Sequence, residues 1–222
     1  MEVFIIVTVL WVFSVCLHEF GHAWAAYCGG DHTVREKGYL TLNPLKYTHP
    51  VYSLVMPVVF MMLGGIGLPG GAVYIERDRL RSRGWNTWVS LAGPAMNLPI
   101  IFLISFAFKL GWLVNDPESV AAVSLGFLLR LEICALVLNL LPIPPLDGFQ
   151  ALAPWLPADL RARGCALANY GILIVFGALW FIPPLNQAFW GLVSSISGAL
   201  GVHPGMGYVG WKAFRFWDHS AF

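Results

Sequence analysis

Charged residues are scarce in this sequence. Aspartate, glutamate, lysine and arginine make up only 11% of its 222 residues, whereas hydrophobic residues make up 58% and the mean hydropathy is +0.69. Because soluble domains carry about 25% charged residues, this composition argues against an ordinary soluble fold and indicates a membrane protein in contact with the lipid bilayer. The net charge of +1 and the lack of a basic cluster predict no nucleic acid partner.

Cysteine is also sparse, and no two cysteines have the CxxC spacing of a metal or redox site. The sequence contains neither a serine-nucleophile motif nor a nucleotide-binding loop, which argues against enzymes of those classes. Most of the cysteines lie in apolar runs, where a thiol usually behaves as a small buried hydrophobe, so we expect no disulfide framework. They are Cys16, Cys28, Cys134 and Cys165.

Long hydrophobic runs fill most of the chain. Several approach or exceed the ~18 to 20 apolar residues that a helix needs to cross a bilayer, and a backbone in lipid must satisfy its own hydrogen bonds. The sequence therefore predicts an all-α polytopic membrane protein with five to six transmembrane helices. The runs lie at about 3–28, 51–68, 87–114, 119–142, 166–182 and 187–201.

The run at 51–68 differs from the others. It is short, contains Pro57 and three glycines, and leads into GLPGGAVYIE. These features predict a re-entrant segment followed by a short β-strand or hairpin at Ala72–Ile75, between the first and second core helices.

The positions of lysine and arginine predict the orientation. If 51–68 crosses the membrane, the basic loop residues divide eight to three between the two sides, and if it re-enters, all eleven lie on one side. The stronger bias favours re-entry, with the N-terminus outside and the basic loops in the cytoplasm. The eight are Arg77, Arg79, Arg81, Arg83, Arg161, Arg163, Lys212 and Arg215, and the three are Arg35, Lys37 and Lys46.

Two histidines and a glutamate interrupt the first run, in the sequence HEFGH at residues 18–22. On a helix His18 and His22 share one face and can reach one ion, while Glu19 projects about 100° away. This pattern suits zinc, with two imidazole ligands and a carboxylate able to take a proton from a metal-bound water. Ionisable groups in a span are costly, which favours function over the alternatives of a polar patch between helices or a histidine pair that packs helices together.

A catalytic zinc needs a third protein ligand. The segment NLLPIPPLDGFQ, residues 139–150, supplies Asp147 directly after a span, in a proline-rich stretch that cannot form a regular helix. The alternative is an ordinary turn at Asp147 and Gly148.

With HEFGH and NLLPIPPLDG together, the chain resembles the site-2 proteases, zinc metalloproteases that cut their substrates within the membrane. LAGPAMN, residues 91–97, is similar to the Gly-Pro-x-x-Asn segment of that family, and LTLNPLKYTHP, residues 40–50, looks like a stretch of its compact bacterial and archaeal members. The resemblance covers about residues 10–150. No stretch resembles the PDZ or CBS domains of larger relatives.

The resemblance implies that His18, His22 and Asp147 bind one Zn²⁺ ion and that Glu19 is the general base. It also implies that Asn97 and Asn139 are polar groups near the site, placed to steady the substrate backbone or a ligand.

The expected organisation is a catalytic transmembrane core at 1–150, accessory transmembrane helices at 151–201 and an amphipathic or frayed tail at 202–222. The expected partner is a transmembrane protein substrate, whose helix must unwind because its carbonyls are already hydrogen-bonded. The substrate would add as a strand to the predicted strand edge, against Gly71, Ala72 and Val73.

With 51–68 re-entrant, two crossings separate HEFGH from Asp147, so the two motifs meet at one side of the membrane. We therefore expect a multi-pass protein of a prokaryotic cytoplasmic membrane, with its active site toward the cytoplasm.

Two alternatives are a non-proteolytic relative that keeps the metal as a scaffold and a small transporter that uses HEFGH as a metal relay. The presence of Glu19 and the clustering of polar residues at one end of three runs favour proteolysis. Arg130 and Glu132, in the middle of the fourth run, do not face each other on a helix. We do not assign them to the site.

Overall fold

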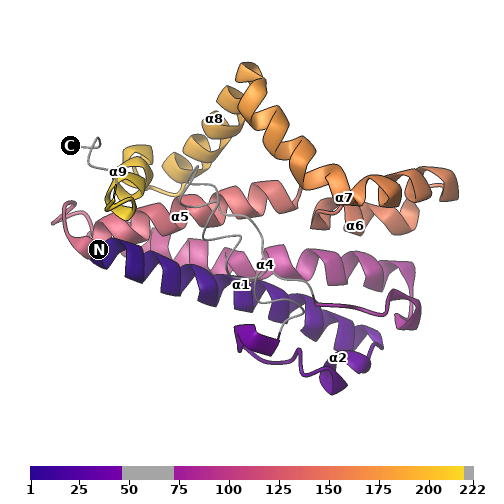
Figure 1. Cartoon of the computed structure of the whole chain (residues 1–222). Helices are drawn as coiled ribbons and strands as arrows, with labels where there is room; N and C mark the ends of the chain where they lie inside the picture. Colours follow the sequence, from indigo (N-terminus) through magenta and orange to yellow (C-terminus); the bar gives the residue numbers. More distant parts are fainter. Residues whose placement is uncertain (47–72, 218–222) are drawn as a thin grey trace.

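The computed structural model describes residues 1–46 and 73–217. Three long helices lie side by side at its centre, and α4 runs antiparallel to both α1 and α5 (Figure 1). Serine side chains cap two of them, because Ser82 accepts a hydrogen bond from the backbone N–H of Trp85 and Ser119 accepts one from Ala122. The three helices are α1 (Glu2–Gly29), α4 (Arg83–Lys109) and α5 (Val120–Asn139).

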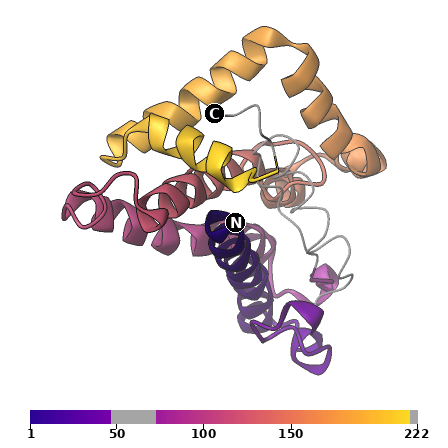
Figure 2. The ribbon, with the colours of Figure 1, turned by 60° about the vertical axis from the view of Figure 1, so that its left-hand side comes forward.

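The C-terminal third adds three helices to this core. α7 and α8 form a V that projects away from the central helices, and α9 packs along the start of α5 (Figures 1 and 2). Phe214 of α9 is fully buried between Phe4 and Phe127, with ring centroids 4.9 and 5.3 Å away. The bounds of these helices are α7 (Ala158–Phe181), α8 (Pro183–Ala199) and α9 (Pro204–Phe214), and the short elements are α2 (Thr33–Glu36), η1 (Pro44–Lys46), η3 (Arg77–Arg79), α6 (Asp147–Leu152) and η4 (Ala153–Trp155).

The number of spans is lower than predicted. Among the described residues, four helices are long and apolar enough to cross a membrane, α1, α4, α5 and α7, so the prediction of five to six was wrong. Pro183 and Pro184 cannot extend α7 and instead begin α8, which has only 17 residues. At 1.5 Å per residue α8 is about 26 Å long, shorter than the ~30 Å hydrocarbon core. The predicted re-entrant segment 51–68 lies outside the described residues.

The predicted β-strand or hairpin is also wrong, since the described residues contain no strand. The segment before η3 bonds to side chains instead of to a second strand. The Val73 N–H donates to Glu19, the Tyr74 carbonyl accepts from Lys37, and the Glu76 N–H donates to Asp31. These side chains satisfy backbone groups that a sheet would otherwise pair.

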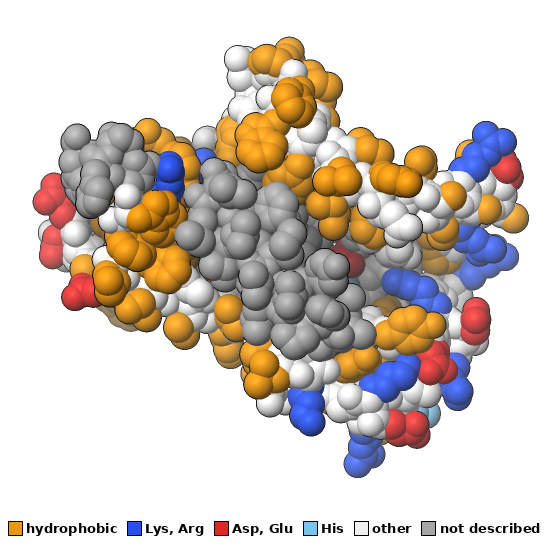
Figure 3. Space-filling model, viewed as in Figure 1, with side chains coloured by type: hydrophobic (Ala, Val, Ile, Leu, Met, Phe, Trp, Pro, Cys, Tyr) orange, Lys and Arg blue, Asp and Glu red, His pale blue; other side chains and the backbone are white. Residues whose placement is uncertain are grey.

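Lysine and arginine side chains gather with several acidic ones at the end of the molecule where α1 ends and α4 begins, a smaller group of acidic side chains lies at the opposite end, and apolar side chains dominate most of the described surface between them in this view (Figure 3). The basic residues at this end come from α2, η3 and the first turn of α4. α9, with Lys212 and Arg215 at its end, lies instead beside the start of α1 and α5. This differs from the expectation that all basic loop residues share one side.

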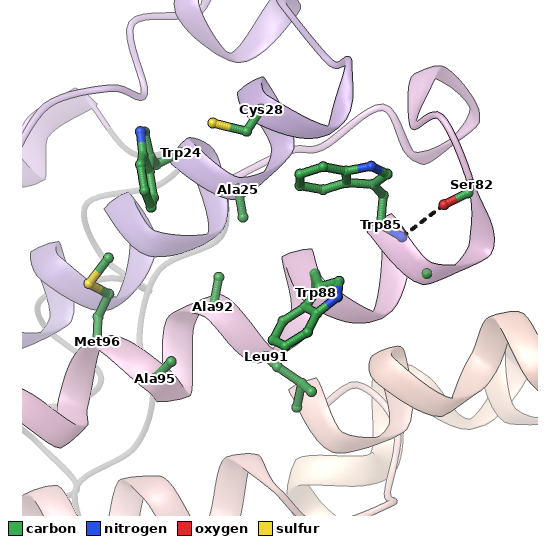
Figure 4. Close-up of a pocket in the computed structure, with 11 residues that line it drawn as sticks. Trp24, Ala25, Cys28, Ser82, Trp85, Trp88, Leu91, Ala92, Ala95 and Met96 are labelled. Carbon is green, nitrogen blue, oxygen red and sulfur yellow. Dashed lines mark hydrogen bonds between the residues drawn. The ribbon is translucent and has the colours of Figure 1, made fainter.

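A hollow of about 760 Å³ opens between α1 and α4. Trp24 and Cys28 of α1 and Trp85 and Trp88 of α4 face it from the two helices (Figure 4). Tryptophan is typical of the membrane–water interface, which favours an interfacial position for this end of the two helices. None of the predicted metal ligands lines the hollow.

Candidate metal centre

His18 and His22 lie one turn apart on α1, and both are buried. The His18 Nδ1 donates to the Asn97 Oδ1 at 2.8 Å, and the His22 Nδ1 donates to the Val89 carbonyl at 2.7 Å. Both of these oxygens can only accept, so each ring, when neutral, carries its proton on Nδ1. The two Nε2 atoms, 3.0 Å apart, therefore direct free lone pairs toward each other.

Asp147 completes the cluster from the first residue of α6. Its Oδ2 lies 3.2 Å from the His18 Nε2, and its Oδ1 lies 3.4 Å from the His22 Nε2. Gly148 lets α6 approach the end of α5, since a Cβ there would lie 2.3 Å from the Leu140 carbonyl oxygen. α6 is also tied to α4, because the Thr87 hydroxyl donates to the Ala151 carbonyl at 2.7 Å.

The donor atoms of these three residues fit zinc. One atom from each lies within 4.8 Å of the others. In the neutral rings the two Nε2 lone pairs converge without a hydrogen between them, an arrangement that a shared cation would stabilise. Tetrahedral ligands bound at 2.0–2.1 Å lie about 3.3–3.4 Å apart, close to the separations of 3.0, 3.2 and 3.4 Å seen here. Two histidines and one carboxylate are a donor set of catalytic zinc sites, which keep a fourth position open.

Glu19 is buried beside this cluster, directly after His18 in α1. Its Oε2 accepts a hydrogen bond from the Val73 N–H at 3.2 Å. Of the three residues expected to touch substrate, Val73 therefore lies next to the predicted general base. Gly71 and Ala72 lie outside the described residues.

The two predicted supporting asparagines are both buried. Asn97 bonds to His18 from α4. Asn139 is the last residue of α5, next to Leu140, against which Gly148 packs. The roles of both asparagines stay predictions.

Gly93 is a site residue that sequence reasoning missed. A Cβ at this position would lie 2.2 Å from the His22 Nε2 and 2.6 Å from the His18 Nε2. Only glycine therefore lets α4 approach the histidines this closely. The signal was present in LAGPAMN, where only the asparagine was interpreted.

Glu132 was also left out of the predicted site. Its Oε2 accepts from the Asn97 Nδ2 at 2.8 Å, which connects α5 to His18 through one side chain.

The electrostatic surroundings keep Asp147 ionised. Burial alone would raise the pKa of its carboxyl, but without a metal the positive charge of the facing His22 and His18 rings, when they are protonated, holds this pKa below its usual range. The ionised form is the one that binds a metal. Burial lowers the pKa of the nearby Arg77 guanidinium, and the charge of Asp147 opposes that shift.

Comparison with known proteins gives relatives along most of the chain. This chain is 46% identical to "Putative zinc metalloprotease Rip2" of Mycolicibacterium smegmatis and 43% identical to the protein of the same name from Mycobacterium tuberculosis. Both matches cover 97% of this chain and 82% of the relative. It is 30% identical to "Putative zinc metalloprotease YwhC" of Bacillus subtilis, over 83% of this chain and 84% of that relative. No family model and no solved structure matches it. The sequence identities over most of both chains, in agreement with the HEFGH and Asp147–Gly148 motifs, show that this chain belongs to the site-2 protease family.

Proposed function

We propose that this chain is an intramembrane zinc metalloendopeptidase that hydrolyses peptide bonds in transmembrane protein substrates. The observation that carries the proposal is the convergence of His18, His22 and Asp147 beside the carboxylate of Glu19. Both histidines and the glutamate belong to α1, a helix that is long and apolar enough to cross a membrane. The names of the relatives, which describe zinc metalloproteases, support the same activity.

In this proposal His18, His22 and Asp147 hold one Zn²⁺ ion. Zinc bound there would supply Lewis acidity, which polarises a peptide carbonyl and makes water more acidic. Glu19 takes a proton from the attacking water and delivers it to the leaving amine, as a general base and then a general acid. The Val73 N–H, 3.2 Å from the Glu19 Oε2, fixes that carboxylate.

The two asparagines support the site in different ways. Asn97 holds the His18 ring through its amide oxygen. Asn139 places a buried amide at the end of α5, beside the turn that presents Asp147.

We place the active site of this multi-pass protein on the cytoplasmic side of a prokaryotic membrane. The antiparallel helices α4 and α5 return the chain to the end where α1 finishes, so HEFGH and Asp147 share that end. The basic residues of α2, η3 and the start of α4 are concentrated there, and cytoplasmic loops carry an excess of lysine and arginine. The bacterial relatives support a prokaryotic membrane.

The test is cleavage of a panel of single-span membrane proteins by protein purified in detergent, with zinc content measured on every sample. Wild type is compared with Glu19→Gln and with Glu118→Gln, a matched change at an exposed glutamate before α5. We expect zinc in all three and turnover lowered about 10²- to 10⁴-fold in Glu19→Gln alone.

Each other result would count against the proposal. Zinc in all samples without cleavage by wild type would favour a non-proteolytic relative that keeps the metal as a scaffold. Cleavage by Glu19→Gln at the wild-type rate would remove Glu19 from the mechanism. A wild-type protein without zinc would overturn the metal site.

A further inference from the structure

Glu132 is a carboxyl group in the middle of a candidate spanning helix, and no described residue supplies a charge that would compensate it. It lies in α5, a candidate membrane span, and its side chain is 0% exposed. Within the described part of the chain it forms no ion pair, and its Oε1 has no hydrogen-bond partner. Arg130, two residues earlier, instead places its guanidinium 4.1 Å from the ring centroid of Trp190. Burying a carboxyl group without a counter-charge is costly, which points to a functional reason for Glu132.

Glu132 has polar contacts with the Asn97 amide and the Ser14 hydroxyl, and the contact with Asn97 leads to the metal centre. Its Oε2 accepts from the Asn97 Nδ2 at 2.8 Å. The Oδ1 of the same amide accepts from the His18 Nδ1 at 2.8 Å, and the His18 Nε2 faces Asp147 and His22. A continuous chain of hydrogen bonds thus runs from α5 through α4 to α1.

The two histidines differ in how their orientation is secured. His22 donates to the Val89 carbonyl of α4, a backbone oxygen that can only accept a hydrogen bond. His18 donates to a side-chain amide, and rotation of that amide by 180° would present an NH₂ group to the ring instead of an oxygen. His18 therefore needs a further group to control Asn97, and His22 does not.

Glu132 supplies this control. A carboxyl oxygen of Glu132 accepts from the NH₂ group of Asn97, which leaves the amide oxygen toward His18. That oxygen keeps the proton of His18 on Nδ1 and the lone pair of Nε2 free for a metal. Ser14, whose Oγ lies 3.4 Å from the Asn97 Nδ2, is a weaker partner, because a hydroxyl can accept or donate.

We propose that Glu132 is a positioning residue that controls the zinc affinity of the site by fixing the orientation of Asn97. The inference rests on the proposed zinc site. It concerns metal binding and not the protease step, so it is testable without a substrate.

The experiment measures the zinc dissociation constant of the purified full-length protein in detergent, by competition with a chelator of known affinity. The variants are Glu132→Gln, which keeps the shape but can present an NH₂ group to Asn97, and Glu132→Leu, which removes both oxygens. Ser124→Ala is the matched control, because Ser124 is also fully buried in α5 and its hydroxyl has no partner within the described residues. We expect zinc affinity about 10- to 100-fold weaker in both Glu132 variants, the loss being larger for leucine, and no change in the control.

A double-mutant cycle separates positioning from a general structural role. If Glu132 acts through Asn97, Asn97→Ala and the double variant Asn97→Ala/Glu132→Leu bind zinc equally well, because the second change has nothing left to orient. The zinc-free forms of wild type and Glu132→Gln should unfold at similar temperatures, while the increase in melting temperature on adding zinc is smaller in the variant.

The outcomes also separate this inference from the proposed function. Wild-type zinc affinity in Glu132→Gln and Glu132→Leu would overturn the positioning role and leave the zinc site intact. Additive losses in the double variant would likewise overturn it, since Glu132 would then act independently of Asn97. A wild-type protein that binds no zinc would overturn the proposed function itself. If Glu132→Leu fails to fold, Glu132→Gln decides.

Discussion

Replacing Gly93 by alanine tests whether the close approach of α4 to the histidines is required for metal binding. The added Cβ would lie 2.2 Å from the His22 Nε2 and 2.6 Å from the His18 Nε2, whereas ordinary contacts begin near 3.4 Å. The rings or the helix must therefore move by about 1 Å. Metal–ligand distances vary by only about 0.2 Å in well-formed sites.

The expected effect on zinc binding is large. A misplacement of about 1 Å in a functional group costs roughly 100-fold, so we expect zinc affinity to fall at least that much, or roughly 2.7 kcal/mol. The assay is the zinc dissociation constant of purified protein, measured by chelator competition. Thermal unfolding of the zinc-free form shows whether the helices still pack.

Gly84→Ala is the matched control on the same helix. Among the residues that the structure describes, a Cβ there would meet only the Ser82 Oγ, at 3.6 Å, which is an ordinary contact. We expect wild-type zinc affinity and unchanged or slightly higher stability, because alanine is favoured over glycine in a helix by about 0.5–1 kcal/mol. Zinc affinity unchanged in Gly93→Ala, or reduced equally in both variants, would refute the reasoning from close approach.

Three further predictions concern the site and the segment that covers Glu19. Asp147→Asn should lower zinc content at least tenfold, because a neutral amide replaces an ionised ligand, and elemental analysis showing full zinc occupancy would contradict this. Val73→Pro removes the N–H that bonds to the Glu19 Oε2, so cleavage should slow while zinc content is unchanged. An unaltered cleavage rate would remove Val73 from the site. Hydrogen bonds from Lys37 and Arg79 lower the pKa of Glu76 from 4.5 to about 2. Because the folded pKa is the lower one, the stability contributed by ionised Glu76 is full above pH ~4.5 and is lost as the pH falls toward ~2. The melting temperature difference between wild type and Glu76→Gln should shrink across that range, and a difference independent of pH would contradict the role of these contacts.

Local pattern was sufficient to predict the candidate ligands. The spacing of His18 and His22 places them on one face of a helix whatever surrounds it, and an acidic residue after a span is visible in the sequence as Asp147. The family resemblance supplied Asn97. Gly93 was not predicted because the need for glycine there comes from the close approach of His18 and His22, which lie about 70 residues away in the sequence. No local periodicity reveals such a contact.

The wrong predictions also have long-range causes. The sequence GLPGGAVYIE, which suggests a turn and then a short apolar segment, favoured a strand. In the described part of this segment, however, the backbone groups bond to Glu19, Lys37 and Asp31, side chains that only the folded end of α1 brings near. The last apolar run was counted as a span, although α8 is too short to cross alone and is turned by Pro183 and Pro184 into one arm of a V. Composition shows how apolar a run is, whereas the turn that precedes the run sets the direction of the helix in the fold.

The sequence by itself determined a helical membrane protein with a histidine pair, a neighbouring glutamate and an aspartate suited to zinc, because hydropathy and helical spacing are properties of neighbouring residues. Only the tertiary structure decided that these groups converge. It brings α4 within reach of the histidines at Gly93, directs both Nδ1 atoms to acceptors, and joins Glu132 to His18 through Asn97. Such contacts depend on how three helices pack, and packing depends on shape complementarity between residues far apart in the chain.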